Sequence, residues 1–162
     1  MTSSKMRFLI TLLLLCVSSV ATAFDQAPKF TLNDLKNTPV SLSNFKGKVI
    51  YVDFWATWCG PCRKSFPWMQ QMYEKYHDLG LEIIAISLDG KKEVINRFLK
   101  QTPITFTILR DQHNRVASKY QVKVMPSSFL IDRDGNFYYR HGGFNDRDKA
   151  KLEENFRDLL LN

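Results

Sequence analysis

Cysteine is scarce in this chain, with three among 162 residues. That number excludes the dense disulfide framework on which many small secreted domains depend. Cys16 lies in an apolar run near the N-terminus, so Cys59 and Cys62 form the only pair in the rest of the chain. The histidines are single and widely separated, whereas a zinc site would need two further ligands at a workable spacing. We therefore expect neither a bound metal nor another cofactor.

Glycine and proline are also few, at seven and six residues, and no low-complexity segment or internal repeat is present. Disorder is therefore not expected, and a hydrophobic content of 44% provides a full core for one globular domain. The formal charge is +7, but the basic residues are mixed with acidic ones and form no basic stripe. This pattern indicates a solvated basic surface and no nucleic-acid partner.

No apolar run approaches the ~20 residues that a helix needs to span a bilayer. Residues 1–23 instead match a secretory signal peptide, with Lys5 and Arg7 before a short apolar run over 8–17. Small residues over 18–23 predict cleavage before Phe24, which leaves a mature domain over 24–162. A retained membrane anchor and a lipid anchor at Cys16 stay open as alternatives. Secretion would place the cysteine pair where disulfides persist, and we expect a periplasmic location.

The chain is organised around residues 49–64, whose sequence is VIYVDFWATWCGPCRK. The first half is a β-branched and aromatic run typical of a buried strand. The second half carries Cys59 and Cys62 just before a predicted helix over 63–76, which Pro67 is expected to kink. A buried strand that delivers two cysteines to a helix N-terminus indicates a redox site.

The remaining segments alternate between strands and helices. Their patterns predict an edge hairpin over 30–32 and 40–42, strands over 81–87, 105–109, 128–131 and 136–140, and helices over 92–101, 114–120 and 147–160. Gly142 and Gly143 are expected to break the chain before the last helix. This order predicts an α/β fold with a mixed central sheet flanked by helices.

The sequence VDFWATWCGPC over 52–62, together with Met125-Pro126 before a strand, resembles the thioredoxin superfamily. The segment over 45–55, the additional strand and helix over 81–101 and the sequence FLIDRDG over 129–135 more narrowly resemble the TlpA/ResA-type extracytoplasmic thiol-disulfide oxidoreductases. The resemblance covers residues 25–160. It implies a thioredoxin-like fold with an N-terminal hairpin extension and a strand–helix insertion.

The two cysteines carry the expected chemistry. Unpaired N–H groups at a helix N-terminus stabilise a thiolate, so Cys59 is expected to be the attacking thiol. Cys62 lies three residues further on, about one helical turn inward, and can resolve a mixed disulfide. The reaction would leave a Cys59–Cys62 disulfide. A purely structural disulfide stays open as the alternative.

Asp53 is expected to assist the cysteines. It lies mid-strand in an apolar run, where a buried carboxylate is costly unless it has a function or a partner. The resemblance matches it to the buried aspartate beneath the thioredoxin CxxC, which helps to deprotonate the second cysteine. Burial would raise its pKa and suit it as a proton acceptor near neutral pH. A carboxylate that reaches solvent or a helix cap is the alternative.

The residues expected to bind the substrate are Trp58, Gly60, Pro61, Met125 and Pro126. Pro126 matches the cis-proline of the superfamily, and the backbone of Met125 would pair with the substrate chain as an added strand. An ordinary trans proline is the alternative. Trp58 and Trp55 are expected to form an apolar rim, although Trp55 fits the core equally well. In the family, Gly-Pro between the cysteines accompanies reducing potentials.

These features predict a monomeric periplasmic enzyme that mainly reduces disulfides in extracytoplasmic proteins. The resemblance implies that a membrane protein supplies its electrons. The alternatives are an oxidase or isomerase of protein disulfides and a copper-binding assembly factor, and the absence of a histidine placed near the cysteines argues against the latter. The stretch Val124-Met-Pro-Ser127 departs from the Gly-x-Pro-Glu typical of the cytochrome c maturation branch, which argues against a dedicated apocytochrome c role.

Overall fold

The structure is a computed structural model that describes residues 25–161. The predicted signal peptide over 1–23, with Cys16, lies outside the described residues. The strands are β1 Thr31–Asp34, β2 Pro39–Ser41, β3 Val49–Trp55, β4 Leu81–Ser87, β5 Thr107–Arg110, β6 Ser127–Ile131 and β7 Phe137–Gly142. The helices are the 3-10 turns η1 Leu42–Phe45 and η2 His77–Leu79, and the α-helices α2 Gly60–Tyr76, α3 Lys92–Gln101, α4 Arg115–Lys119 and α5 Asp148–Leu161.

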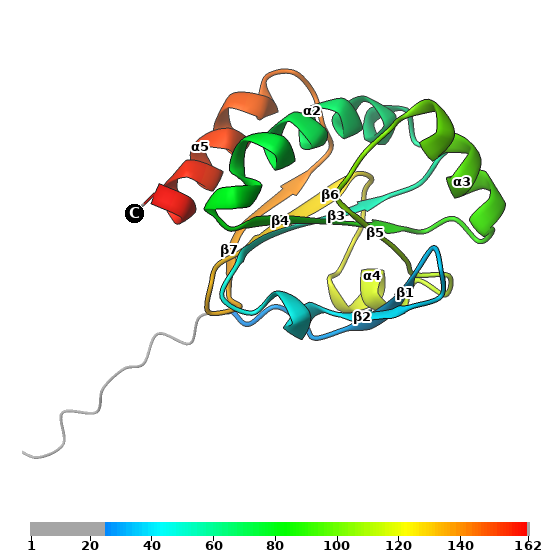
Figure 1. Cartoon of the computed structure of the whole chain (residues 1–162), viewed down its shortest axis with the longest axis horizontal. Coiled ribbons are helices and arrows are strands. Elements are labelled where there is room, and N and C mark those ends of the chain that lie inside the picture. The colour runs from blue at the N-terminus through cyan, green and yellow to red at the C-terminus, as the bar shows by residue number, and fades with distance from the viewer. Residues whose placement is uncertain (1–24, 162) are drawn as a thin grey trace, which may run out of the picture.

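The seven strands form one mixed sheet in the order β2-β1-β5-β4-β3-β6-β7. Strands β3, β4 and β5 are parallel, while β6, β7 and the β1–β2 hairpin pair antiparallel. Every residue of β3 and β4 is buried, which explains why both sequences are nearly continuous apolar runs. In Figure 1, helices α2, α3 and α5 cover one face of the sheet, and α4 lies on the other face beside the hairpin.

Two hydrophobic cores lie on the two faces of the sheet. The larger packs Tyr51 and Trp55 of β3 with buried residues of helices α2, α3 and α5. The smaller packs Val52 and Phe54 of the same strand against α4. Because successive side chains of a strand point to opposite faces, Asp53 shares the face of Tyr51 and Trp55. The central strand thus directs a carboxyl group toward the layer that contains α2.

The predicted α/β fold, with its mixed sheet and N-terminal edge hairpin, is confirmed. Helix α2, however, begins at Gly60 rather than at residue 63, because Cys59 caps it and a proline is tolerated in a first helical turn. The helix also continues through Pro67 to Tyr76 without interruption. Gly142 is the last residue of β7, so the chain breaks only at Gly143, whose φ is +85°.

Candidate active site at the start of helix α2

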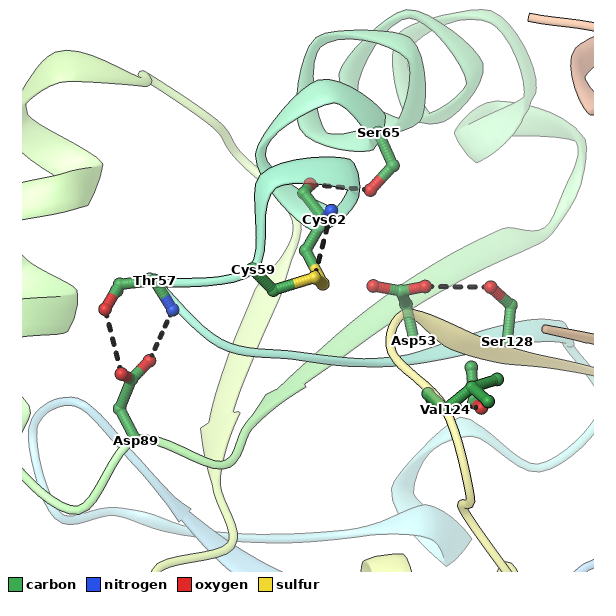
Figure 2. Close-up of a disulfide and its surroundings, with 9 residues drawn as sticks. Asp53, Thr57, Cys59, Cys62, Ser65, Asp89, Val124 and Ser128 are labelled. Atoms are coloured by element: carbon green, nitrogen blue, oxygen red, sulfur yellow. Dashed lines mark hydrogen bonds between the residues drawn. A yellow bond between two sulfur atoms is a disulfide. The ribbon is translucent and has the colours of Figure 1, made fainter. Parts of the chain in front are cut away.

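Cys59 and Cys62 are joined by a disulfide at the start of helix α2, as Figure 2 shows. Cys59 is the N-cap residue, and the N–H of Cys62 donates to its Sγ at 3.2 Å. After reduction, this N–H and the partial positive charge of the helix start would stabilise a thiolate at Cys59. Cys59 retains 6% exposure and Cys62 none, so an incoming disulfide can reach only the first sulfur.

The loop that delivers Cys59 is fixed to the end of strand β4. Asp89, buried just beyond that strand, accepts hydrogen bonds from the N–H and the hydroxyl of Thr57, both at 2.8 Å (Figure 2). The hydroxyl of Ser87 donates to the same carboxylate at 2.9 Å. Sequence reasoning missed Thr57 and Asp89. The available signal was an aspartate two residues beyond the end of a buried apolar strand.

Asp53 lies on β3 and is 1% exposed. The hydroxyl of Ser128 donates to its Oδ1 at 2.8 Å, whereas Oδ2 has no hydrogen-bond partner among the described residues. Figure 2 shows this second oxygen turned toward the two sulfur atoms. Burial raises the pKa of Asp53 from 3.8 to about 7, against the lowering effect of the Ser128 bond. The carboxyl group can therefore exchange a proton near neutral pH, and the alternative of a solvated carboxylate is wrong.

The peptide bond between Met125 and Pro126 is cis, as the resemblance implied. The segment before this bond and the start of α2 enclose a groove of about 560 Å³ beside the disulfide. Its lining contains no acidic residue and is largely apolar: Trp58, Cys59, Gly60, Pro61, Leu88, Val122, Lys123, Val124 and Met125. The N–H of Gly143 donates to the Pro126 carbonyl at 2.8 Å, which ties the segment to the end of β7.

The structure brings together every site residue predicted from the sequence, but it gives the two tryptophans different positions. Trp58 is 72% exposed and lines the groove. Trp55 is fully buried, with its ring 4.4 Å from that of Phe66 and 5.1 Å from that of Phe98 between centroids. Trp55 therefore belongs to the core, and the expected rim consists of Trp58 together with the segment before Pro126.

A second hollow, of about 320 Å³, lies where β3 begins and where the β6–β7 turn closes, away from the cysteines. Among residues 25–161, no three metal-ligating side chains gather into a cluster. None of the helices in this part of the chain is both long enough and apolar enough to cross a membrane. Of the two hollows, only the groove has a cysteine, Cys59, in its lining, so it is the one in which cysteine chemistry can occur.

Comparison with known proteins connects this geometry to a family. Residues 24–140 match the AhpC/TSA family. The thiol-disulfide oxidoreductase ResA of Bacillus thuringiensis subsp. konkukian is 37% identical over 134 residues, which cover 83% of this chain and 76% of the relative. A solution structure from Bacteroides thetaiotaomicron, provisionally assigned as a protein disulfide isomerase, is 28% identical with a TM-score of 0.78 and covers 85% of this chain and 89% of that one.

A crystal structure from Chlorobium tepidum is also similar and is provisionally assigned as the thiol:disulfide interchange protein DsbE. It is 46% identical with a TM-score of 0.82, over 85% of this chain and 96% of that one. The family match over residues 24–140 includes strands β1 to β6 and both cysteines of the disulfide. The chain therefore belongs to the AhpC/TSA family of thioredoxin-like proteins and is a thiol-disulfide oxidoreductase of the ResA type.

Proposed function

We propose that this protein works in the periplasm, mainly as a reductant of disulfides in extracytoplasmic proteins. The main observation behind the proposal is the spatial arrangement of three side chains. Cys59 lies at a helix start, Cys62 is buried behind it, and the Asp53 carboxyl group is turned toward both sulfurs. The signal-peptide pattern over 1–23 supports a location outside the cytosol. The Gly-Pro pair between the cysteines supports a reducing potential.

The reduced pair begins the cycle. The thiolate of Cys59 attacks one sulfur of a partner disulfide and forms a mixed disulfide, while the other partner sulfur leaves and takes a proton from solvent. The partner chain lies in the apolar groove as an extended segment, where the backbone of Met125 pairs with it as an added strand. Trp58, Gly60 and Pro61 form the wall of the groove nearest to the reacting sulfur.

Cys62 completes the cycle. Its thiol transfers a proton to Asp53, and the resulting thiolate attacks the Sγ of Cys59. The second partner sulfur leaves as a thiolate and takes a proton from solvent, so the partner departs reduced by two electrons and the enzyme retains the Cys59–Cys62 disulfide. A membrane protein that carries electrons from the cytoplasm is the proposed donor that reduces this disulfide again.

The reduction potential of residues 24–162, measured by equilibration with dithiothreitol or glutathione buffers, tests the direction of electron flow. We expect about −250 mV or lower, near the thioredoxin end of the scale. A value between about −120 and −180 mV would replace the reductant by an oxidase or isomerase. Cysteines that do not cycle at all, but bind Cu(I) in a fixed ratio, would instead support the copper-binding alternative.

Trapping of mixed disulfides tests the assigned roles of the two cysteines. A Cys62→Ser variant should accumulate disulfides between Cys59 and its protein partners, because the resolving thiol is missing. The matched Cys59→Ser variant should trap none, because Cys62 is fully buried. Equal trapping by both variants would overturn the proposed order of attack.

A further inference from the structure

Lys123 is the one basic or acidic side chain in the lining of the groove beside the disulfide. It is exposed and forms no ion pair among residues 25–161. Asp89 directly follows the lining residue Leu88, but it is buried, and its carboxylate accepts hydrogen bonds from Thr57 and Ser87. The Lys123 ammonium group therefore faces the groove without an acidic neighbour in its wall.

A smaller hollow, of about 240 Å³, adjoins the groove near the end of β7. The two hollows share Lys123 and Val124, so these two residues form the ridge between them. The smaller hollow also includes Arg140 in its lining and, like the groove, contains no acidic residue. Arg140 forms an ion pair with Asp25. Within the described part of the chain, Lys123 is thus the cation of this combined surface that lacks an acidic partner.

Exposed apolar side chains border the same surface. Trp58 is 72% exposed and Val124 is 55% exposed, and both line the groove. Exposed tryptophans are frequent anchors of protein interfaces. A charge beside apolar walls is also screened less than a charge in open water, so a carboxylate gains more from pairing with it. The surface therefore fits a partner segment that carries both apolar and acidic side chains.

The position of the acidic residue in the partner follows from the reaction. The reacting cysteine of the partner must point into the groove, because Cys59 is the sulfur that can be reached. In an extended segment, residues two positions apart point to the same side and lie about 6.6–7 Å from each other. The side chains two positions before and after the partner cysteine therefore also face the groove, whose wall contains Lys123.

We propose that the groove selects partner disulfides in which an acidic residue lies two positions from the cysteine, and that Lys123 recognises this residue. The inference rests on the proposed function, because the partner must lie in the groove as an extended segment. The carboxylate pairs with the Lys123 ammonium group, while apolar neighbours pack against Trp58 and Val124. Charges at the rim of an interface mainly change the rate of association, so the preference belongs to the second-order rate constant.

The test uses the reduced form of residues 24–162 and symmetric disulfides of a short peptide with a single cysteine. Glu, Gln or Lys occupies the positions two residues before and after that cysteine. Each reaction converts one enzyme dithiol and one peptide disulfide into the enzyme disulfide and two peptide thiols, which are counted after acid quenching. We expect the Glu peptide to react about fivefold faster than the Gln peptide, and the Lys peptide to be slowest. Rates with dithiothreitol, an uncharged thiol, correct for the intrinsic reactivity of each peptide.

Substitutions at Lys123 and at a distant lysine separate local recognition from net charge. Lys123→Gln should remove the difference between the Glu and Gln peptides, and Lys123→Glu should make the Lys peptide the fastest. Lys36→Gln, in the exposed turn between β1 and β2, removes the same charge and should keep the wild-type order. The wild-type preference should also weaken as NaCl rises from about 50 to about 500 mM, because salt screens exposed charges.

Three results would overturn the inference. They are equal rates for the three peptides with the wild type, the wild-type order in Lys123→Glu, and a loss of preference in Lys36→Gln as complete as in Lys123→Gln. Failure of the proposed function looks different. If the reduction potential proves oxidising, the oxidised protein and the peptide thiols give the same comparison in reverse, and only the direction of electron flow is wrong. If the wild type exchanges with no peptide in either direction, the proposed function is wrong and the inference falls with it.

Discussion

The protonation of Asp53 should be visible in the stability of the folded protein. Its pKa rises from 3.8 to about 7 because the carboxyl group is buried. Between these two values the folded state holds a proton that the unfolded chain has released, so stability falls as pH rises. A rise of this size corresponds to a loss of about 4 kcal/mol, which is complete once pH passes the folded-state pKa. About 3 kcal/mol of this loss should occur between pH 5 and pH 8.

The measurement is urea unfolding of the oxidised protein at several pH values from 5 to 8, for the wild type and for Asp53→Asn. The disulfide stays intact, so neither cysteine titrates. The free energy of unfolding of the wild type should fall relative to that of the variant by about 3 kcal/mol over this range. Only the change with pH is compared, since the asparagine brings its own burial cost at every pH.

Asp134→Asn provides the matched control. Asp134 is exposed in the β6–β7 turn, so its replacement should leave the pH profile parallel to that of the wild type. Parallel profiles for Asp53→Asn would refute the reasoning, because they would mean that the carboxyl group ionises equally easily in the folded and unfolded states. Ser128→Ala should extend the loss to higher pH, since the Ser128 bond lowers the pKa of Asp53.

Five further substitutions test the surroundings of the site. Asp89→Ala leaves the half-buried N–H and hydroxyl of Thr57 without their acceptor and should cost about 2–4 kcal/mol of unfolding free energy in urea. An unchanged value would show that the loop does not depend on this carboxylate. Trp55→Ala should lower the free energy of unfolding by about 3–5 kcal/mol in the same assay, because the Trp55 side chain is fully buried. Trp58→Ala should lower it by less than about 0.5 kcal/mol, because Trp58 is exposed, but should weaken substrate binding. Gly142→Ala places a Cβ 2.9 Å from Cγ2 of Val124, which lines the groove, so it should raise KM for a peptide disulfide. Gly90→Ala is the control: its Cβ meets no atom within 4 Å, so KM should not change.

Much of the fold follows from patterns that are local in the sequence. The apolar runs of β3 and β4 predict central buried strands, and the amphipathic spacing over 92–101 predicts helix α3 with the bounds observed. The start of α2 was placed three residues late, because the capping role of Cys59 depends on backbone geometry rather than on a typical capping residue type.

The contacts that position the site could not be predicted in the same way. Thr57 and Asp89 are separated by 32 residues, and Asp53 and Ser128 by 75. Each contact depends on which strands become neighbours in the sheet and on their register, and neither property can be read from a local pattern. The sequence marks Asp53 and Asp89 only as carboxylates at apolar positions, without naming the groups that satisfy them.

The register of β3 determines both how the core packs and where the Asp53 carboxyl group lies. Pairing with β4 and β6 fixes which face each residue of β3 occupies, and Tyr51 and Trp55 fill the core beneath α2. A slip of one residue would move both aromatic rings to the opposite face, so packing strongly disfavours it. The same constraint keeps Asp53, which lies between them, on the face of the disulfide. The aromatic residues that stabilise the sheet therefore also aim the carboxyl group, and the burial that they produce raises its pKa into the range where it can accept a proton from Cys62.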